Sequence, residues 1–390
     1  MPASLTAAGR KALQAQNRAI MELFEARGFE HIRPRILQPA DVFLEKSGED
    51  IRARTFLFTD PDGQRELCLR PDLTVPTCRY HLAAAEDAAA EAKYCYRGPA
   101  FRFHGGSDPL FTDEFEQAGV EWFGAADAPR ADAEILGLAL EALKISGLAA
   151  PNVMTGDVAL IRALLASMNM PERWRRRLLM RFRRPTDFHA TLRRMASRDD
   201  GPRTSLSGLV DKLAGFSGQT GLDEAIALVE AELARRELPL VGGRGAEAIA
   251  RRLLEKAQDR KTPPLPPAAV RLVEDFLAIS GPAKGCAGQL MDIAKRAGKP
   301  MKLAVEGYLR RLEHLPDGGR VAFDAGFGRA FDYYTGFVFQ IEAASGGKTL
   351  AVAGGGRYDG MLAGLGGPDT PACGLGIHTE RLLMAAGGAA

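Results

Sequence analysis

The stretch that decides the fold is EFEQAGVEWFG, at residues 114–124. Polar and apolar residues alternate along it, as they do in a strand, where side chains two positions apart share a face. One face carries Gln117, Gly119 and Glu121, and the opposite face carries three apolar side chains. We therefore expect a strand with two polar groups on either side of a glycine that leaves room above it.

The preceding segment, YCYRGPAFRFH at 94–104, predicts a second strand. Glycine and proline in the connection that follows it indicate a loop, so the two strands are expected to pair. The same alternation places Arg102 and His104 together on one face, opposite two phenylalanines. The pair of strands thus combines an arginine with an amide and a carboxylate.

Further upstream, LRPDLT at 69–74 adds Arg70, Asp72 and Thr74 at a spacing of two. Arginine can hold a carboxylate through two hydrogen bonds, and carboxylate, amide and hydroxyl groups can hold an ammonium or an imidazole N–H. The combined set therefore matches a free amino acid. The alternative is a solvated outer face of the sheet, which also places polar residues at every second position.

Helical and extended segments alternate along the chain without the repeated spacing of parallel βαβ units. This order predicts an α+β fold with a largely antiparallel sheet flanked by helices. In chain order we expect a helix at 7–27 that Gly28 ends, a hairpin at 56–69 with Asp62 and Gly63 in its turn, an alanine-rich helix at 81–92, a helix at 130–147, and β segments at 321–326, 331–343, 349–360 and 372–378 before a short final helix.

The middle of the chain is helical and rich in arginine, and it ends in the proline-rich sequence KTPPLPPAA. We predict a first core segment at 1–159, an inserted helical domain at 160–264 and a second core segment at 265–390. The run ERWRRRLLMRFRRP, at 172–185, is typical of an amphipathic helix with its arginines in water. Nucleic-acid binding is the alternative, and the near balance of positive and negative charges along the chain argues against it.

The composition excludes several classes of protein. The chain of 390 residues has 51 lysines and arginines against 49 aspartates and glutamates, so no global basic field attracts nucleic acid. Five scattered cysteines without a CxxC spacing predict reduced thiols in the core and no metal site. No apolar run is long enough for a membrane helix or a signal peptide, so we expect a cytoplasmic protein.

The order of motifs resembles the catalytic core of histidyl-tRNA synthetase, a class II aminoacyl-tRNA synthetase. The resemblance covers roughly residues 28–383 apart from the helical insertion. Its most specific parts are RAFDYYTG at 329–336 and GGGRYDG at 354–360, which look like the two histidine-recognition signatures of that family. The resemblance implies a class II fold: an antiparallel sheet flanked by helices.

Carried over position by position, the resemblance also implies roles for individual residues. Asp72 falls where the family binds the substrate ammonium, Arg102 falls on the arginine of motif 2, and Arg381 falls on the arginine of motif 3 that contacts ATP phosphates. The histidine-like ligand is therefore expected to bind at Asp72, Thr74, Arg102, Gln117, Glu121, Arg329, Tyr333, Tyr334 and Tyr358.

Three departures from the synthetase pattern argue against a complete enzyme. His104 replaces the motif 2 glutamate that helps to hold adenine, and an imidazole cannot accept two hydrogen bonds as a carboxylate does. His378 replaces a glycine of motif 3, which puts a ring where the nucleotide needs space. We also expect no C-terminal anticodon-binding domain.

These departures make the sequence similar to the synthetase-like regulatory subunits of ATP phosphoribosyltransferase, which catalyses the first step of histidine biosynthesis. That resemblance implies a short-form catalytic subunit as partner, histidine as the feedback effector, a homodimer within a hetero-oligomer, and neither a cofactor nor a catalytic residue in this chain. Class II homodimers form through motif 1, here around 32–43. Two alternatives remain: a truncated enzyme that activates histidine with ATP, and a scaffold with a vestigial site.

Overall fold

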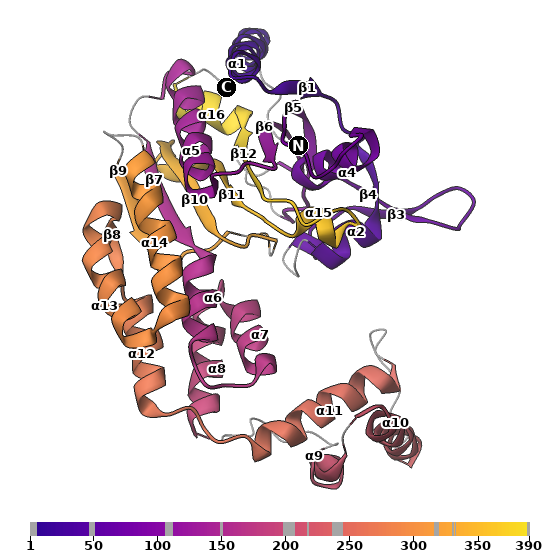
Figure 1. The fold of residues 1–390 in the computed structure, drawn as a ribbon. Coiled ribbons are helices and arrows are strands. Elements are labelled where there is room, and N and C mark those ends of the chain that lie inside the picture. The colour runs from indigo at the N-terminus through magenta and orange to yellow at the C-terminus, as the bar shows by residue number, and fades with distance from the viewer. Residues whose placement is uncertain are drawn as a thin grey trace. The chain divides into compact units, whose positions relative to one another are not determined.

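The computed structural model describes residues 6–46, 51–105, 112–148, 151–197, 207–216, 218–235, 245–315, 320–329, 331 and 333–387. The chain divides into two compact units. The first joins Met1–Ser167 to Asp275–Ala390, and the second is Met168–Glu274. The second unit overlaps the helical insertion predicted at 160–264, and it begins and ends later in the chain. Figure 1 shows the elements of both units.

A nine-stranded sheet forms the centre of the first unit within the described residues. Its strands, in spatial order, are β1 (Glu30–Ile32), β5 (Ala92–Phe101), β6 (Glu114–Phe123), β12 (Ala372–His378), β11 (Lys348–Arg357), β10 (Phe337–Ser345), β7 (Asn152–Asp157), β9 (Arg320–Asp324) and β8 (Ser280–Pro282). The pairs β1–β5 and β7–β9 are parallel, and the other pairs are antiparallel. The predicted α+β fold is confirmed, with a sheet that is mixed rather than wholly antiparallel.

A smaller sheet has the order β2 (Leu37–Pro39), β4 (Glu66–Leu69) and β3 (Leu57–Thr59). The antiparallel pair β3–β4 is the predicted hairpin. Gly63 in its turn has φ +70°, a conformation that glycine adopts without strain. The Asp60 carboxylate accepts hydrogen bonds from the backbone N–H groups of Gln64 and Arg65, which closes the turn.

Helices pack around these sheets. The first unit contains α1 (Ala7–Ala26), α2 (Ala40–Lys46), α4 (Thr74–Ala84), α5 (Ala128–Ile145), α6 (Val158–Ala166), the short 3₁₀ helix η2 (Ala283–Cys286), α13 (Ala287–Ala297), α14 (Lys299–His314), α15 (Met361–Gly364) and α16 (Thr379–Ala385). As predicted, α1 ends just before Gly28, whose φ is +84°. None of the described helices is both long and apolar enough to cross a membrane.

The position of α4 corrects one prediction. The helix begins at Thr74 and ends at Ala84, whereas the alanine-rich sequence suggested a helix at 81–92. After Ala84 the chain turns, and the Asp87 carboxylate accepts a hydrogen bond from the backbone N–H of Ala89. A short polar side chain that bonds to its own backbone competes with helix, and here it outweighs the helix propensity of alanine.

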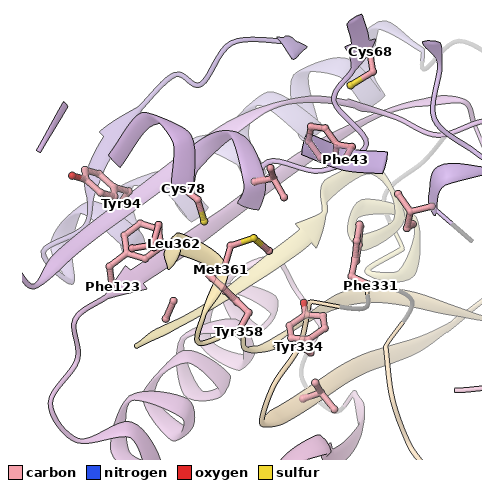
Figure 2. Packing of buried hydrophobic residues seen from close by; sticks show 14 of the residues in the cluster. Phe43, Cys68, Cys78, Tyr94, Phe123, Phe331, Tyr334, Tyr358, Met361 and Leu362 are labelled. Atoms are coloured by element: carbon pink, nitrogen blue, oxygen red, sulfur yellow. The ribbon is translucent and has the colours of Figure 1, made fainter. Parts of the chain in front are cut away.

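The core of the first unit brings distant segments together. Figure 2 shows Phe43, Cys78, Tyr358 and Met361 in one apolar cluster that also contains Tyr334. All five cysteines are free and buried, as predicted. The cluster fixes the segments that carry Tyr334 and Tyr358 against the N-terminal part of the chain.

Four buried charged side chains form an ion-pair network in the first unit. Arg311 of α14 donates from Nε to Asp132 of α5 at 2.9 Å and from Nη1 to Asp157 of β7 at 2.8 Å. Arg357, at the end of β11, donates from Nε to the other oxygen of Asp132 at 2.9 Å. The network therefore fixes the residue that directly precedes Tyr358.

The second unit is helical. It contains α7 (Glu172–Arg181), α8 (Pro185–Ser197), α9 (Ser207–Lys212), the 3₁₀ helix η1 (Leu213–Gly215), α10 (Gly218–Arg235) and α11 (Ala246–Lys261), and α12 (Pro267–Leu277) covers the boundary with the first unit. Trp174, Leu178 and Phe182 are buried, which confirms the predicted apolar stripe of the arginine-rich segment.

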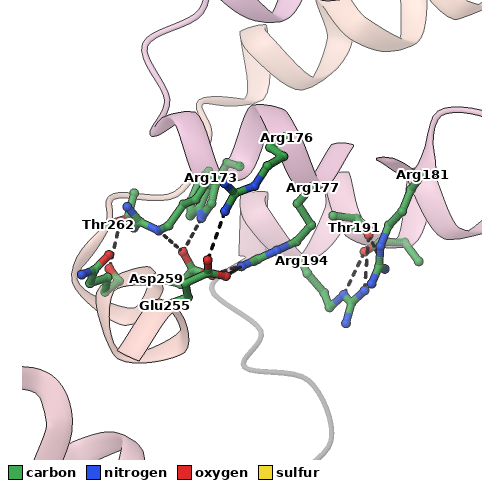
Figure 3. A network of polar contacts seen from close by, with 12 residues as sticks. Arg173, Arg176, Arg177, Arg181, Thr191, Arg194, Glu255, Asp259 and Thr262 are labelled. Atoms are coloured by element: carbon green, nitrogen blue, oxygen red, sulfur yellow. Dashed lines mark hydrogen bonds and ion pairs between the residues drawn. The ribbon is translucent and has the colours of Figure 1, made fainter. Parts of the chain in front are cut away.

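The arginines of α7 are not simply solvated, however. Asp259 of α11 accepts hydrogen bonds from Arg173, Trp174 and Arg177, at 2.6 to 2.7 Å. Arg176 pairs with Glu255 of the same helix at 3.1 Å (Figure 3). The arginines therefore join two helices, a role that periodicity within α7 could not predict because the acidic partners lie about eighty residues later.

Candidate functional site

Glycines on β12 make room for the polar side chains of β6. Glu121 lies opposite Gly374, and Gly119 lies opposite Gly376. A methyl group at Gly374 would lie 1.8 Å from Oε2 of Glu121, and one at Gly376 would lie 2.3 Å from Nε2 of Gln117. Only glycine fits at these two positions while the carboxyl and amide groups keep their places.

Glu121 is the centre of the site. Its side chain is buried, and Tyr96 donates a hydrogen bond to Oε1 at 2.9 Å while Tyr358 donates to Oε2. Burial raises the pKa of the Glu121 carboxyl to about 8, and the hydrogen bonds from Tyr358, Thr74 and Tyr96 oppose this rise. At neutral pH the group is therefore largely protonated, and a cationic or N–H-bearing ligand would favour its ionised form.

Tyr96 is a site residue that sequence reasoning missed. It lies on β5 directly opposite Gly119. A methyl group at Gly119 would lie 2.6 Å from the Tyr96 hydroxyl, so this phenol fills the space that we expected the glycine to leave open. The alternation of β5 was the available signal, because Tyr96 points to the same face as its cross-strand partner.

Asp72 is the second buried carboxyl. It precedes α4, and Oδ1 accepts a hydrogen bond from the backbone N–H of Val75 at 3.2 Å. The Tyr333 hydroxyl donates to Oδ2 at 3.5 Å. Burial raises the pKa of Asp72 to about 6, and the positive charge of Arg102 is the largest effect that opposes this rise. Asp72 and Arg102 therefore lie near each other, as the sequence predicted.

The spacing argument for LRPDLT is wrong in its geometry. β4 ends at Leu69, so the residues that follow do not alternate along a strand. Arg70 is buried and donates to the carbonyl oxygens of Pro34 and Pro99, which makes it a structural residue. Thr74 is the first residue of α4, and its hydrogen bond to Glu121 places it in the site.

Arg102 lies between two aromatic rings. Its guanidinium carbon is 5.0 Å from the ring centre of Phe115 and 5.1 Å from that of Phe331, and Nε donates to the carbonyl oxygen of Pro71 at 2.7 Å. Burial lowers its pKa to about 10, so Arg102 remains charged at neutral pH. It supplies a fixed positive charge beside Asp72.

The two neighbouring tyrosines differ in their surroundings. Tyr333 bonds to Asp72, and its ring centre lies 5.8 Å from that of Tyr358. Tyr334 belongs to the apolar cluster of Figure 2. Both precede β10, which begins at Phe337, so neither is a residue of the sheet itself.

Arg329 and Gln117 occupy neighbouring positions over the sheet. Arg329 donates from Nη1 to the carbonyl oxygen of Phe339 at 2.8 Å, and a methyl group at Gly354 would lie 1.1 Å from that Nη1. Gly354 pairs with Gly376, over which Gln117 lies. Within the described residues, Oε1 of Gln117 and Nε of Arg329 are buried without a hydrogen-bond partner. A ligand that bonds to both atoms would satisfy them.

The residues that depart from the synthetase pattern border this site. The backbone N–H of His104 donates to Asp113 at 2.8 Å, and burial lowers the pKa of its imidazole. The imidazole of His378 stacks on Phe115, with ring centres 4.5 Å apart. Arg381 donates from Nη1 to the carbonyl oxygen of Ala351 at 3.5 Å.

The polar face of β6 is therefore buried, which excludes the interpretation of a solvated outer face. Two buried carboxyl groups and a buried arginine, with partly unsatisfied amide and guanidinium groups, suit a small zwitterion better than an apolar molecule. No group of three or more histidine, cysteine or acidic side chains is arranged to hold a metal ion in the part of the chain that the structure describes.

This fold is that of a class II synthetase-like protein. The family model of histidyl-tRNA synthetase matches residues 5–238 and 246–382. A solved structure from Bacillus halodurans, titled ATP phosphoribosyltransferase regulatory subunit/histidyl-tRNA synthetase, is similar with a TM-score of 0.65 at 20% identity, over 97% of this chain and 79% of that one. Histidyl-tRNA synthetase from a Nostoc species has a TM-score of 0.61 at 17% identity, over 99% of this chain and 74% of that one.

Closer relatives have one name in common. The chain is 33% identical to the ATP phosphoribosyltransferase regulatory subunit of Brucella anthropi, over 95% of this chain and 96% of that protein. It is 37% identical to the protein of the same name from Mesorhizobium japonicum, over 93% and 95% of the two chains. The chain belongs to the family of ATP phosphoribosyltransferase regulatory subunits.

Proposed function

We propose that this chain is a non-catalytic regulatory subunit that supports a short-form ATP phosphoribosyltransferase, the enzyme of the first step of histidine biosynthesis, and that free histidine inhibits the complex by binding to it. The observation that carries the proposal is the buried site around Glu121. Two tyrosines donate hydrogen bonds to this carboxyl, Asp72 lies near it, and Arg102 lies near Asp72. Relatives that match over more than nine-tenths of this chain carry the name of the regulatory subunit.

Each charged group of the site has a counterpart on histidine. Arg102 provides a fixed positive charge for the carboxylate, and Asp72 provides an acceptor for the ammonium group. Glu121 and its tyrosines provide acceptors and donors for the imidazole nitrogens. We propose that Tyr334 and Arg329 line the sides of the histidine site. The residues proposed to contact histidine are the nine predicted positions and Tyr96: Asp72, Thr74, Tyr96, Arg102, Gln117, Glu121, Arg329, Tyr333, Tyr334 and Tyr358.

Inhibition requires more than binding. A ligand shifts an equilibrium only if it binds the active and inactive states of the complex unequally. A coupling of about 1–3 kcal/mol between two sites changes an affinity roughly 5- to 150-fold, which is enough for feedback control. The site is buried and ionisable, so small movements of β6 or α4 would change the free-energy cost of burying each charge. Histidine would then bind the active and inactive states with different affinities.

The decisive experiment reconstitutes the complex. The purified chain is mixed with the short-form catalytic subunit, and phosphoribosyl transfer to ATP is measured with and without histidine. We expect stimulation by the wild-type chain and inhibition by histidine, and a chain with Glu121→Ala that still stimulates but is much less sensitive to histidine. Glu134→Ala, an exposed change on α5, serves as the matched control. Absence of stimulation by the wild type would refute the proposal.

A synthetase-like enzyme that activates histidine with ATP is the second candidate, and the two retained arginines are the observation in its favour. Arg102 and Arg329 both lie in the site, where the synthetase pattern has them. Histidine-dependent exchange of pyrophosphate into ATP by the isolated chain discriminates between the two functions. The regulatory function predicts no exchange, and rapid exchange would support the enzyme instead.

We also propose that two copies of the chain pair through the small sheet. Leu37 is 52% exposed on β2, and Leu57 and Phe58 are 42% and 39% exposed on β3. These side chains lie in and beside the segment 32–43, where the resemblance places a dimer contact. Light scattering of the wild type and of Leu37→Lys tests this pairing: we expect a dimer and a monomer, respectively.

The remaining expectations follow the same function. A biosynthetic regulatory subunit would work in the cytoplasm and needs no cofactor of its own. The ion pairs between α7 and α11 occupy several arginines that would otherwise face a nucleic acid, which supports our expectation that none is bound. Filter binding with tRNA checks this last point.

A further inference from the structure

Arg181 and Arg194 donate hydrogen bonds to the same hydroxyl group. Nη1 of Arg181, the last residue of α7, lies 2.8 Å from Oγ1 of Thr191 on α8, and Nη2 of Arg194 lies 3.4 Å from the same oxygen. Figure 3 shows the two guanidinium groups meeting at Thr191. Two positive charges are thus held close together, where they repel each other.

Packing between α7 and α8 holds this arrangement in place. Phe182 and Phe188 are buried, and their rings make an edge-to-face contact with centres 6.2 Å apart. Thr191 is only 2% exposed and lies three residues before Arg194, on the same face of α8. Nε of Arg194 also donates to the carbonyl oxygen of Ala190 at 3.3 Å. The hydroxyl is therefore fixed by the interior of the helix pair, with both guanidinium groups positioned around it.

These two arginines differ from the others of α7 in their counter-charges. Four arginines earlier in the helix pair with carboxylates: Arg173, Arg175, Arg176 and Arg177. Within the described residues, no carboxylate lies at ion-pair distance from Arg181 or Arg194. Asp187, in the first turn of α8, is exposed and pairs with neither of them. An anion bound between the two guanidinium groups would supply the missing negative charge and relieve their repulsion.

We propose that Arg181, Thr191 and Arg194 form a binding site for the terminal phosphate group of a small anion. Each guanidinium group directs its N–H donors at different phosphate oxygens, and the hydroxyl of Thr191 is a further donor. The site lies in the second unit, whereas Glu121 lies in the first. The proposal does not depend on the proposed regulatory function.

The geometry favours a phosphate group over other anions. A carboxylate is planar and has two oxygens, which the fork of one guanidinium group already satisfies, whereas the oxygens of a phosphate point in several directions and suit two forks at once. A nucleic-acid backbone needs cations spaced along a groove. The arginines that would extend the site along α7 are instead paired with Asp259 and Glu255 of α11.

The test compares anions and variants of the full-length chain. Binding of inorganic phosphate, pyrophosphate and acetate is measured by calorimetry at constant ionic strength, because salt screens exposed charges. Arg181→Gln and Arg194→Gln each remove one charge from the site. Arg251→Gln is the matched control, since Arg251 is an exposed arginine of the same unit that already pairs with Glu247. Urea unfolding without anion checks that each variant is folded.

We expect the wild type and Arg251→Gln to bind phosphate or pyrophosphate equally well, and each of the other two variants to bind about ten-fold or more weakly, as is usual for the loss of a hydrogen bond to a charged group. The relative affinities for phosphate and pyrophosphate show which source of the phosphate group the site accepts. Absence of binding, or equal binding by all four proteins, would overturn the proposal. Acetate bound as tightly as phosphate would do the same, because the site would then accept a carboxylate.

A second measurement assigns the binding to the second unit. The chain has two tryptophans, and in a Trp122→Phe background the fluorescence of Trp174 follows this unit alone. An anion that binds only the native state raises its stability. Phosphate or pyrophosphate should therefore raise the urea midpoint of the Trp174 signal above that in sodium chloride of equal ionic strength, and Arg194→Gln should abolish this rise. An unchanged midpoint would place the bound anion in the first unit and refute the site.

A short RNA hairpin tests the nucleic-acid alternative. If the hairpin bound more tightly than pyrophosphate and with the same loss in both glutamine variants, the cluster would be part of a nucleic-acid interface and the proposal would be wrong. These outcomes are independent of the reconstitution experiment, which measures stimulation of the catalytic subunit and its inhibition by histidine.

Discussion

The hydroxyl of Tyr358 donates a hydrogen bond to Oε2 of Glu121, although the two residues are 237 positions apart in the chain. Tyr96 donates to the other oxygen from β5, the strand next to β6. Both carboxyl oxygens thus accept hydrogen bonds from neutral phenols. Burial raises the pKa of Glu121 to about 8, although these hydrogen bonds oppose the rise. The site therefore combines residues from both stretches of the chain that form the first unit.

This relationship predicts how stability depends on pH. The native state holds the Glu121 proton up to about pH 8, whereas the unfolded chain releases it near the ordinary value of 4.5. Between these values the native state binds more protons, so the free energy of unfolding falls as the pH rises, on the order of 1 kcal/mol per pH unit. Glu121→Gln removes this titration and should become progressively more stable than the wild type from pH 5.5 to 8.5.

Thermal unfolding across that range, without histidine, measures the difference. Glu134→Gln is the control, because Glu134 is exposed and, among the residues that the structure describes, forms an ion pair with Arg130 of the same helix alone. A constant difference between the wild type and Glu121→Gln at every pH would show that Glu121 does not take up the proton.

The glycines under the site predict a second effect. In Gly374→Ala the added methyl group would lie 1.8 Å from Oε2 of Glu121 and 2.6 Å from the carbonyl oxygen of Val120. Because one of these is backbone, the side chain of Glu121 must move and lose its bond to Tyr358. We expect about 1–3 kcal/mol of destabilisation and a histidine affinity reduced about ten-fold or more.

The matched control is Gly307→Ala in α14, where nothing lies within 4 Å of the added methyl group. Alanine is favoured over glycine inside a helix, so this variant should gain about 0.5–1 kcal/mol. Urea unfolding and calorimetry with histidine compare the two. Normal histidine affinity in Gly374→Ala would mean that Glu121 is not part of the histidine site.

Sequence periodicity predicted the paired strands β5 and β6 and the shared face of Gln117 and Glu121, because alternation depends only on neighbouring residues. It could not tell that this face is buried, since the covering residues come from α4 and from the segment before β10. Tyr96 was missed for a related reason: a tyrosine on a strand is also typical of an apolar core. The polar face becomes a buried site through contacts with residues distant in the sequence, which a local sequence pattern does not show.

The buried charge network predicts a third effect, away from the ligand. Asp132 binds Arg311 with one oxygen and Arg357 with the other, and its side chain is fully buried. Asp132→Asn keeps the shape of the side chain but removes the negative charge that balances the buried positive charges of the two arginines. We expect a loss of about 3–5 kcal/mol in the free energy of unfolding, as is usual when one partner of a buried ion pair is removed.

Urea unfolding at pH 7 measures this loss, and Glu134→Gln again provides an exposed comparison, with about 0.5 kcal/mol or less expected. Because Arg357 directly precedes Tyr358, the Asp132 variant should also bind histidine more weakly at temperatures where it remains folded. If the variant were as stable as the wild type, the attraction between the charges of the network would only offset the cost of removing them from water.

Asp259 predicts a fourth effect, confined to the second unit. It accepts hydrogen bonds from Arg173, Trp174 and Arg177, so Asp259→Ala leaves the indole N–H and two guanidinium groups of α7 without this partner. An orphaned buried donor costs about 1–3 kcal/mol, and the exposed pairs add little. Glu255→Ala, which breaks only the half-exposed pairs with Arg176 and Arg177, should cost about 1 kcal/mol or less.

The chain's two tryptophans allow each unit to be followed by itself, since Trp122 lies in the first unit and Trp174 in the second. In a Trp122→Phe background, the fluorescence of Trp174 should report earlier urea unfolding for Asp259→Ala than for Glu255→Ala. In a Trp174→Phe background, the fluorescence of Trp122 should be unchanged by either substitution. Equal effects of the two substitutions on Trp174 would mean that charge alone, and not the bond from the indole to Asp259, holds α7 against α11.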